Sequence, residues 1–195
     1  MDGTVGLASG SPRRKQILES LGLTVSQLPA GIDETRGTNE AIVDYVARLA
    51  REKARFGADE SGVSAIPVVA GDTAVALNEQ LFDKPRDEAH AVQMLLSLSG
   101  KVHQVHTSVA VLWQGSLKVD VVSSSVSFSA ITEREAHDYW ASGEPEGKAG
   151  AYAIQGLGGR FVKHLSGSYT GVMGLPVFEV WKRLTALTEW SVKSS

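Results

Sequence analysis

Two long stretches of alternating apolar and polar residues lie in the middle of the chain, at 101–113 and 117–130. In the first stretch every second residue from Val105 to Trp113 is apolar or a threonine, which places these side chains on one face of an extended strand. Gln114-Gly115 separates the two stretches and suits a tight turn, so we expect a long antiparallel hairpin. Such a hairpin, in a chain that also contains strand–helix units, restricts the fold to an α/β or α+β class with a mixed sheet.

Four other segments have the spacing of amphipathic helices. The most regular is 39–57, and shorter helices are predicted at 87–98, 132–141 and 176–188. The helix at 132–141 begins with a capping box, because Thr132 is followed three residues later by Glu135. The apolar stripe of the long helix contains Ile42, Tyr45, Val46, Leu49 and Phe56.

Residues 7–14, Leu-Ala-Ser-Gly-Ser-Pro-Arg-Arg, join a short strand to a helix. Ser11 lies at the N-cap and Pro12 at the first helical position, where its missing N–H costs nothing. Arg13 and Arg14 then lie in the first turn, where cations oppose the helix dipole unless an anion such as a polyphosphate binds between them. A simple strand–helix turn with two solvated arginines explains the spacing equally well.

Composition narrows the class of protein. A chain of 195 residues, 43% apolar and 21% charged, suits one domain over residues 1–195, or two small lobes around a shared sheet. The net charge of −3 argues against a protein that coats nucleic acid, and the absence of cysteine excludes disulfides, zinc thiolate sites and thiol catalysis. No apolar run approaches the ~20 residues of a membrane span. We expect a cytoplasmic protein without membrane or nucleic-acid partners.

Asp72 follows a predicted short buried strand at 66–71. Ligands of open α/β sheets gather at the carboxyl ends of strands, so an acid at this place could activate water or hold a metal ion. The alternative is a local turn, because Asp followed by Thr73 is favourable turn chemistry. The position at a strand end favours the functional interpretation.

Two lysines are candidate phosphate ligands. Lys53 lies eleven residues after Ile42 on the apolar stripe, where its ammonium needs a partner or must extend to the surface. Lys84 precedes Pro85, which restricts the backbone and could hold a loop that presents the lysine. By spacing alone, Lys84 is more simply a solvated turn residue.

An acid and an amide complete the candidates. Glu34 lies before the long helix and could bind a hard cation such as Mg²⁺, although acids before helices are common for electrostatic reasons. Gln155 lies in a glycine-rich stretch, 143–174, for which we predict little regular structure beyond a strand near 160–165. Its amide both donates and accepts, as the edge of a nucleobase requires, but it could equally satisfy backbone groups of its loop.

Together these segments resemble the Maf family of nucleoside triphosphate pyrophosphatases. The resemblance extends from about Val5 to about Trp181, with the motifs in the family's order. The motifs are Leu-Ala-Ser-Gly-Ser-Pro-Arg-Arg (7–14), Arg-Glu-Lys-Ala (51–54), Gly-Asp-Thr (71–73), Asp-Lys-Pro-Arg (83–86), Leu-Ser-Gly (98–100), Gly-Lys-Ala-Gly-Ala-Tyr (147–152), Ile-Gln-Gly (154–156), Gly-Ser-Tyr (167–169) and Gly-Leu-Pro (174–176).

The resemblance implies an α/β fold: an elongated mixed β-sheet flanked by helices, with a cleft between two lobes, similar to inosine triphosphate pyrophosphatases. It also implies hydrolysis of a nucleoside triphosphate between its α and β phosphates, releasing a monophosphate and pyrophosphate. A divalent metal cation, Mg²⁺ or Mn²⁺, is the implied cofactor. The implied partner is the small-molecule substrate, and a homodimer is expected because dimers are common among relatives.

The resemblance also assigns roles to residues. Asp72 matches the catalytic base, and Asp72 and Glu34 are the implied metal ligands. The phosphate-binding set corresponds to Ser9, Arg13, Arg14, Lys53 and Lys84. Arg13, Thr73 and Gln155 occupy the positions that separate the branches of the family, and they match the dTTP/UTP branch. A Gln amide can accept from the N3–H of a pyrimidine while it donates to a ring carbonyl.

Two alternatives remain for the function. The substrates could be modified pyrimidine triphosphates more than dTTP or UTP themselves. The chain could instead be a nucleotide-binding sensor in cell division or stress, without significant turnover.

Overall fold

The computed structural model describes residues 3–188. Its strands form one seven-stranded mixed sheet with the order β2-β1-β3-β5-β6-β7, and β4 pairs with β3. The strands are β1 (Thr4–Ala8), β2 (Thr24–Leu28), β3 (Val68–Leu77), β4 (Gln80–Phe82), β5 (Val102–Trp113), β6 (Ser116–Phe128) and β7 (Val162–Ser166). The helices are α1 (Pro12–Ser20), α2 (Ile42–Ser61), α3 (Glu88–Leu98), α4 (Glu133–Trp140), α5 (Tyr169–Met173) and α6 (Val177–Thr188), with 3₁₀ turns η1 (Ala149–Ala151) and η2 (Leu157–Phe161).

The chain divides into two compact units. Unit 1 comprises the residues up to Asp72, Thr107–Val121 and the residues from Gly174 onward. Unit 2 comprises Thr73–His106 and Val122–Met173. The strands β3, β5 and β6 each contribute residues to both units. Within the sheet β1 pairs in parallel with β3, whereas β4 pairs antiparallel with β3, which confirms the predicted mixed α/β sheet.

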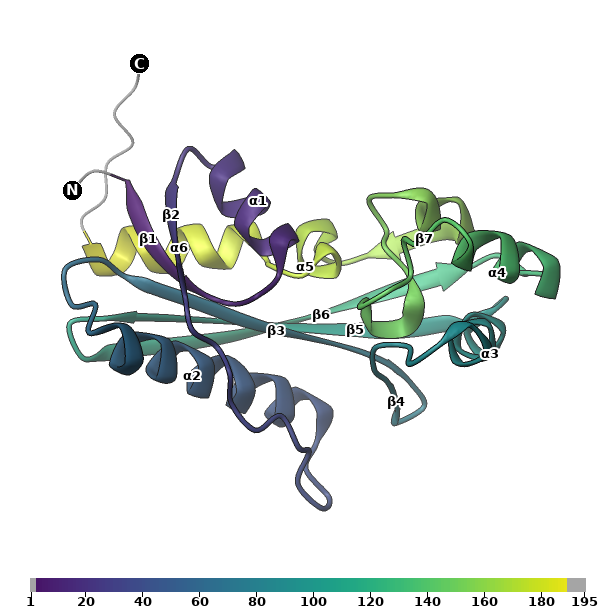
Figure 1. Cartoon of the computed structure of the whole chain (residues 1–195), viewed down its shortest axis with the longest axis horizontal. Helices are drawn as coiled ribbons and strands as arrows, with labels where there is room; N and C mark the ends of the chain where they lie inside the picture. The colour runs from purple at the N-terminus through teal and green to yellow at the C-terminus, as the bar shows by residue number, and fades with distance from the viewer. Residues whose placement is uncertain (1–2, 189–195) are drawn as a thin grey trace. The chain divides into compact units, whose positions relative to one another are not determined.

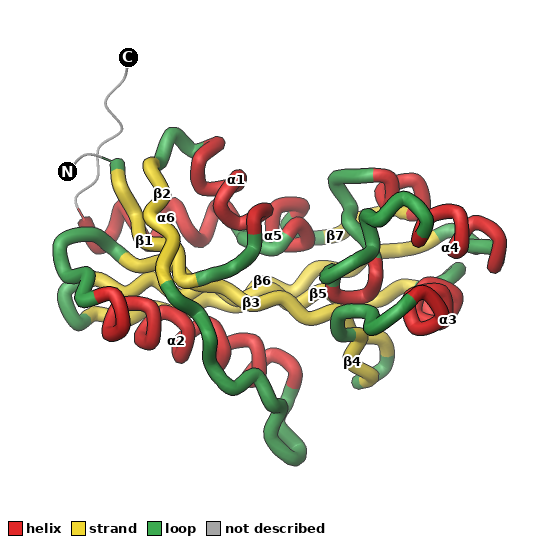
Figure 2. Tube along the Cα trace, viewed as in Figure 1, coloured by secondary structure: helices red, strands yellow, loops and turns green. Residues whose placement is uncertain are grey.

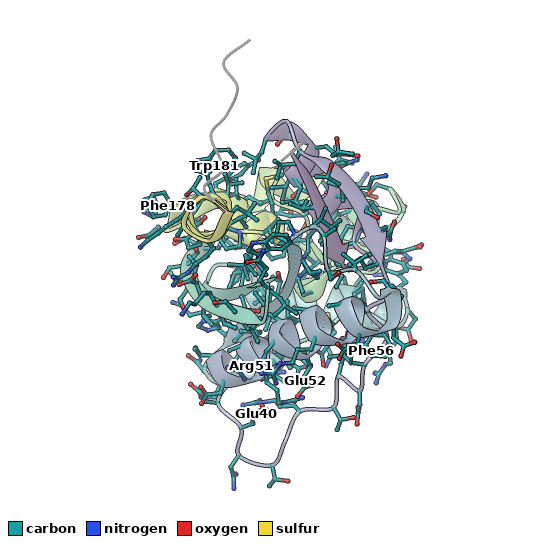
Figure 3. All side chains as sticks on the ribbon, turned by 90° about the vertical axis from the view of Figure 1, so that its left-hand side faces the viewer. Glu40, Arg51, Glu52, Phe56, Phe178 and Trp181 are labelled. Atoms are coloured by element: carbon teal, nitrogen blue, oxygen red, sulfur yellow. The ribbon has the colours of Figure 1, made fainter. Side chains whose placement is uncertain are left out.

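Unit 1 places helices on both faces of its strands. In Figure 1, α2 lies on one side of these strands, and α1 and α6 lie on the other. β1 pairs in parallel with β2 and with β3, an arrangement that is stable because the helices cover both faces. Figure 3 views the same layers from the side, with Phe178 and Trp181 labelled on α6 and Phe56 labelled on α2.

The predicted long helix is present but displaced along the chain. It spans Ile42–Ser61 rather than 39–57, because Asn39 has a positive φ of 61° and Gly62 ends the helix in the left-handed conformation. The predicted stripe from Ile42 to Leu49 is buried, as amphipathic spacing requires.

Unit 2 packs α3 and α4 together over a separate apolar core (Figure 2). Both helices begin with a side-chain cap, and of the two only the cap at Thr132 was predicted. Asp87 accepts from the backbone N–H of His90 at 2.8 Å, and Thr132 and Glu135 form the predicted capping box. The predicted helices and the hairpin turn at Gln114-Gly115 are therefore confirmed.

Three parts of the chain differ from the predictions. The strand predicted at 66–71 continues without interruption as β3, from Val68 to Leu77. Strand β2 was not predicted; its residues are mostly exposed and show little apolar alternation. The glycine-rich stretch 143–174 contains η1, η2 and the short helix α5 in addition to the expected strand.

His103 is a buried histidine in the core of unit 2. Its side chain is 1% exposed, its Nε2 lies 2.9 Å from the Tyr152 hydroxyl, and its ring packs edge-on against Phe128 and Tyr152. Its Nδ1 has no hydrogen-bond partner among residues 3–188. Burial lowers the pKa of His103 from 6.5 to about 4, because the imidazolium would lose its hydration.

This burial makes a prediction for acid stability. The unfolded chain takes up a proton at His103 near pH 6.5 but the folded chain only near pH 4, so the stability that His103 contributes above pH 6.5 is lost as the pH falls between these values. As the pH falls from 6.5 to about 4, we expect the free energy of unfolding of the natural protein to fall by about 3 kcal/mol more than that of a His103→Gln variant. Urea denaturation of both proteins at several pH values measures this difference. Parallel curves would show that His103 takes up its proton at the same pH in the folded and the unfolded chain, so that burial does not lower its pKa.

Candidate functional site

The first part of the candidate site lies where β1 leads into α1. Ser9 is buried, and its hydroxyl oxygen accepts from the backbone N–H of Ser11 at 3.2 Å and from the Arg14 guanidinium at 3.1 Å. Arg14 also donates through Nε to the carbonyl of Gly174, at 2.8 Å. Ser11 occupies the predicted N-cap position, but its side chain makes no capping hydrogen bond. Ser9 therefore organises this turn, and Arg14 is held by protein groups rather than by solvent alone.

Lys53 is buried and paired with two acids. Its ammonium nitrogen lies 2.8 Å from Oδ1 of Asp72 and 2.6 Å from Oε1 of Glu34. The side chain reaches this place because α2 approaches β1 closely one turn later: a Cβ on Gly57 would lie 2.6 Å from that of Ala8. The alternative that Lys53 extends to the surface is wrong, because its paired ammonium remains inside.

Asp72 lies within β3 rather than at its end, so the predicted strand boundary is wrong. Its backbone N–H donates to the hydroxyl of Ser108 at 3.2 Å, and that hydroxyl donates to the carbonyl of Val46 at 2.6 Å. The alternative of a local turn is also wrong, because the Asp72 carboxylate bonds to Lys53 across unit 1. Ser108 was not predicted, since nothing in its spacing distinguishes it from the other residues of β5.

The loop that carries Glu34 is anchored to α2. The hydroxyl of Tyr45 donates to the backbone carbonyl of Glu34 at 2.9 Å. Arg48 donates to both carboxylate oxygens of Glu40, at 2.7 and 3.0 Å, and to the carbonyl of Thr35 at 3.0 Å. The hydrogen bonds from Arg48 and from a backbone amide lower the pKa of Glu40 to about 2. Figure 3 labels Glu40 in this loop. The position of Glu34 therefore depends on contacts from α2 that the spacing of residues in the sequence did not indicate.

Cationic and acidic side chains lie close together at this site. Burial lowers the pKa of Arg14, whereas the nearby charges of Asp72 and Glu34 raise it. Arg13 precedes Arg14 in the first turn of α1 and is half-buried. Arg14 and Lys53 supply two positive charges, which offset the two carboxylates, so an anion that enters this site with a cation would meet both kinds of partner.

Three further candidates belong to unit 2. Thr73 follows Asp72 on β3 and is half-buried. Lys84 is exposed in the loop after β4, and Gln155 is exposed between η1 and η2. The contacts described above therefore bring together Ser9, Arg14, Glu34, Lys53 and Asp72, all within unit 1.

Asp72 and Glu34 have the donor atoms that a hard cation requires. Both carboxylates contact the same ammonium, so their oxygens are separated by no more than the sum of those two contact distances. No group of three or more acids, histidines or cysteines capable of holding a metal occurs in residues 3–188. Mg²⁺ at nucleotide sites usually uses one or two carboxylates together with phosphate oxygens, and two acids fit that pattern.

The chain is similar to proteins of one known family. Residues 4–187 match the family model described as "Maf-like protein". The chain is 48% identical to a dTTP/UTP pyrophosphatase of Escherichia coli O157:H7, over 92% of this chain and 90% of that protein. It is also 48% identical to a dTTP/UTP pyrophosphatase of Pseudoalteromonas translucida (strain TAC 125), over 92% and 94% of the two chains.

Among solved structures, the chain is similar to the Ham1 protein of Staphylococcus aureus, with 13% identity and a TM-score of 0.36 over 94% of this chain and 90% of that one. In the part of the chain that the structure describes, no helix combines the length and apolar character needed to cross a membrane.

Proposed function

This chain belongs to the Maf-like protein family, and on that premise we propose that it hydrolyses nucleoside triphosphates to the monophosphate and pyrophosphate, with dTTP and UTP as its preferred substrates. The observation that carries this proposal is the ion-paired group beside Arg14, in which the buried Lys53 contacts both the buried Asp72 and the exposed Glu34. A carboxylate held among cations is suited to water activation next to a phosphate ester.

The proposed reaction is an in-line attack of water on the α-phosphorus. Asp72 orients the water and accepts its proton, and pyrophosphate leaves with the bonding electrons. Arg13, Arg14, Lys53 and Lys84 offset the charge of the triphosphate, while Ser9 holds Arg14 in place. Asp72 and Glu34 would hold a divalent cation such as Mg²⁺, which would supply further charge compensation to the triphosphate.

Base preference is assigned to Arg13, Thr73 and Gln155. The identity of the chain to proteins named dTTP/UTP pyrophosphatase supports the substrate preference itself. The amide of Gln155 offers the acceptor and donor that the N3–H and a carbonyl of thymine or uracil require.

A turnover assay across the common nucleotides tests the proposed function. We expect pyrophosphate release with Mg²⁺, fastest with dTTP and UTP, and none when a chelator removes the metal. Modified pyrimidine triphosphates belong in the same panel, because a higher kcat/KM for one of them would identify it as the substrate. Tight nucleotide binding without pyrophosphate release would contradict the proposal and indicate a sensor.

A further inference from the structure

Gln155 lies in a segment of unit 2 whose position is set by its backbone. The segment runs from Ala153 to Gly159 and enters the 3₁₀ turn η2 only at Leu157. Gln155 is exposed. The contacts that fix the backbone on either side of Gln155 therefore decide where its side chain starts and in which direction it leaves the backbone.

Glu144 supplies that attachment from a different loop. Its Oε1 accepts from the hydroxyl of Tyr139 at 2.6 Å and from the backbone N–H of Gly158 at 2.9 Å, and its Oε2 accepts from the N–H of Leu157 at 2.9 Å. The Tyr139 oxygen in turn accepts from the N–H of Ala153 at 3.1 Å. The segment is thus held two residues before Gln155, and two and three residues after it.

The fit around this carboxylate leaves no room for side chains. A Cβ on Gly156 would lie 2.0 Å from Oε2 of Glu144, and a Cβ on Gly158 would lie 2.4 Å from the Tyr139 oxygen. These close approaches account for the glycines, because only a residue without a side chain lets the backbone meet the acid. The glycine-rich sequence and Glu144 therefore form one packed unit.

Tyr139 makes the attachment rigid. Its side chain is fully buried, and its ring packs edge-on against Phe161 with centroids 5.3 Å apart. Burial and the contact with Glu144 raise the pKa of Tyr139, so it remains a hydroxyl donor. Desolvation opposes the charge of Glu144, but the hydrogen bonds from Tyr139, Gly158 and Leu157 outweigh it and lower its pKa, so the carboxylate remains an acceptor.

We propose that Glu144 is a positioning residue for base recognition: through Tyr139 and the amides of Leu157 and Gly158 it fixes the backbone that presents Gln155 to the pyrimidine. This inference rests on the proposed function, in which Gln155 contacts the base. Glu144 contacts no reacting atom in this scheme, because three protein donors occupy its two oxygens.

The test compares Glu144→Gln and Tyr139→Phe with a matched control, Glu146→Gln. Glu146 lies in the same loop, carries the same charge and is exposed. Losing a hydrogen bond to a charged group costs enough to raise the KM for dTTP about tenfold, with kcat changed less than twofold. The kcat/KM ratio of dTTP to dGTP should fall by a similar factor, whereas a merely destabilised protein would lose activity on both nucleotides equally. The control should match the natural protein.

A double variant separates an effect through Gln155 from any other effect. Gln155→Ala alone should raise the KM for dTTP, and adding Glu144→Gln should raise it no further. The inference would be overturned if the two substitutions together raised the KM for dTTP by the product of their separate effects, or if Glu144→Gln left the KM unchanged. If Glu144→Gln does not fold, Tyr139→Phe removes one hydroxyl from the same network and gives the same comparison.

The two proposals fail in different ways. If the natural protein releases no pyrophosphate from any nucleotide, the proposed function is wrong. The dissociation constant for dTTP, measured by calorimetry on the same variants, still tests the positioning role. A tenfold weaker affinity in Glu144→Gln but not in the control Glu146→Gln would support it, and equal affinities would refute it.

Discussion

Replacing Asp72 by Asn is expected to lower kcat for dTTP by about 10²–10⁴-fold while the protein still binds the nucleotide. The amide has the size of the carboxylate but cannot accept the proton of the attacking water. It can still accept a hydrogen bond from Lys53, which also keeps its contact with Glu34. The effect should therefore appear in turnover more than in binding or folding.

Pyrophosphate release under saturating dTTP measures this effect, and equilibrium binding of dTTP provides the second readout. Asp59→Asn is a matched control, because Asp59 is an exposed acid on α2 in the same unit. A kcat within a few fold of the natural value would show that Asp72 is not the base. Loss of dTTP binding with intact folding would instead place Asp72 mainly in ligand binding.

Replacing Lys53 by Met should lower the free energy of unfolding by about 3–5 kcal/mol. Methionine keeps the length of the side chain on α2 but removes the charge that compensates Asp72. The Asp72 side chain is only 13% exposed and would be left as an uncompensated charge. Glu34 is 45% exposed and can be solvated, so most of the cost arises at Asp72.

Urea denaturation of Lys53→Met, with Arg55→Met as a control on the exposed side of the same helix, measures this cost. The control should change stability by no more than about 0.5 kcal/mol. Combining Lys53→Met with Asp72→Asn should restore part of the lost stability, because the unpaired charge is then absent. A loss below about 1 kcal/mol in Lys53→Met would mean that the Asp72 carboxylate finds water or another cation.

Elements with a local signal were predicted well. The alternation of residues 101–113, the capping box at Thr132 and the proline at the start of α1 each specify an element through contacts within a few residues. The length of β3 was not predicted, because Asp72-Thr73 is also good turn chemistry. Its extended backbone at Asp72 is stabilised by Ser108, which lies 36 residues away.

In the candidate site, too, the sequence indicated residues with a local signal but not their distant partners. Lys53 stood out because a lysine on an apolar stripe needs a partner, yet spacing could not say which partner it has. Asp72 lies 19 residues from Lys53 in the sequence, and the two meet only because α2 packs onto the strands of unit 1. Nothing in the sequence singled out Glu144 or Tyr139, because a glutamate and a tyrosine near the end of a helix are common at protein surfaces. Their role follows only from the contacts with the segment around Gln155 in the folded protein.

The order of residues along this chain by itself determined the helices other than α5, the hairpin, the strand–helix turn at 7–14 and the residue types available for phosphate chemistry. The tertiary structure alone decided which acid meets Lys53, how the Glu34 loop is anchored and what holds the segment around Gln155. The physical reason is range: periodicity and capping depend on neighbours within about one or two turns, whereas buried charges and loop amides find their partners only when distant segments pack and exclude water.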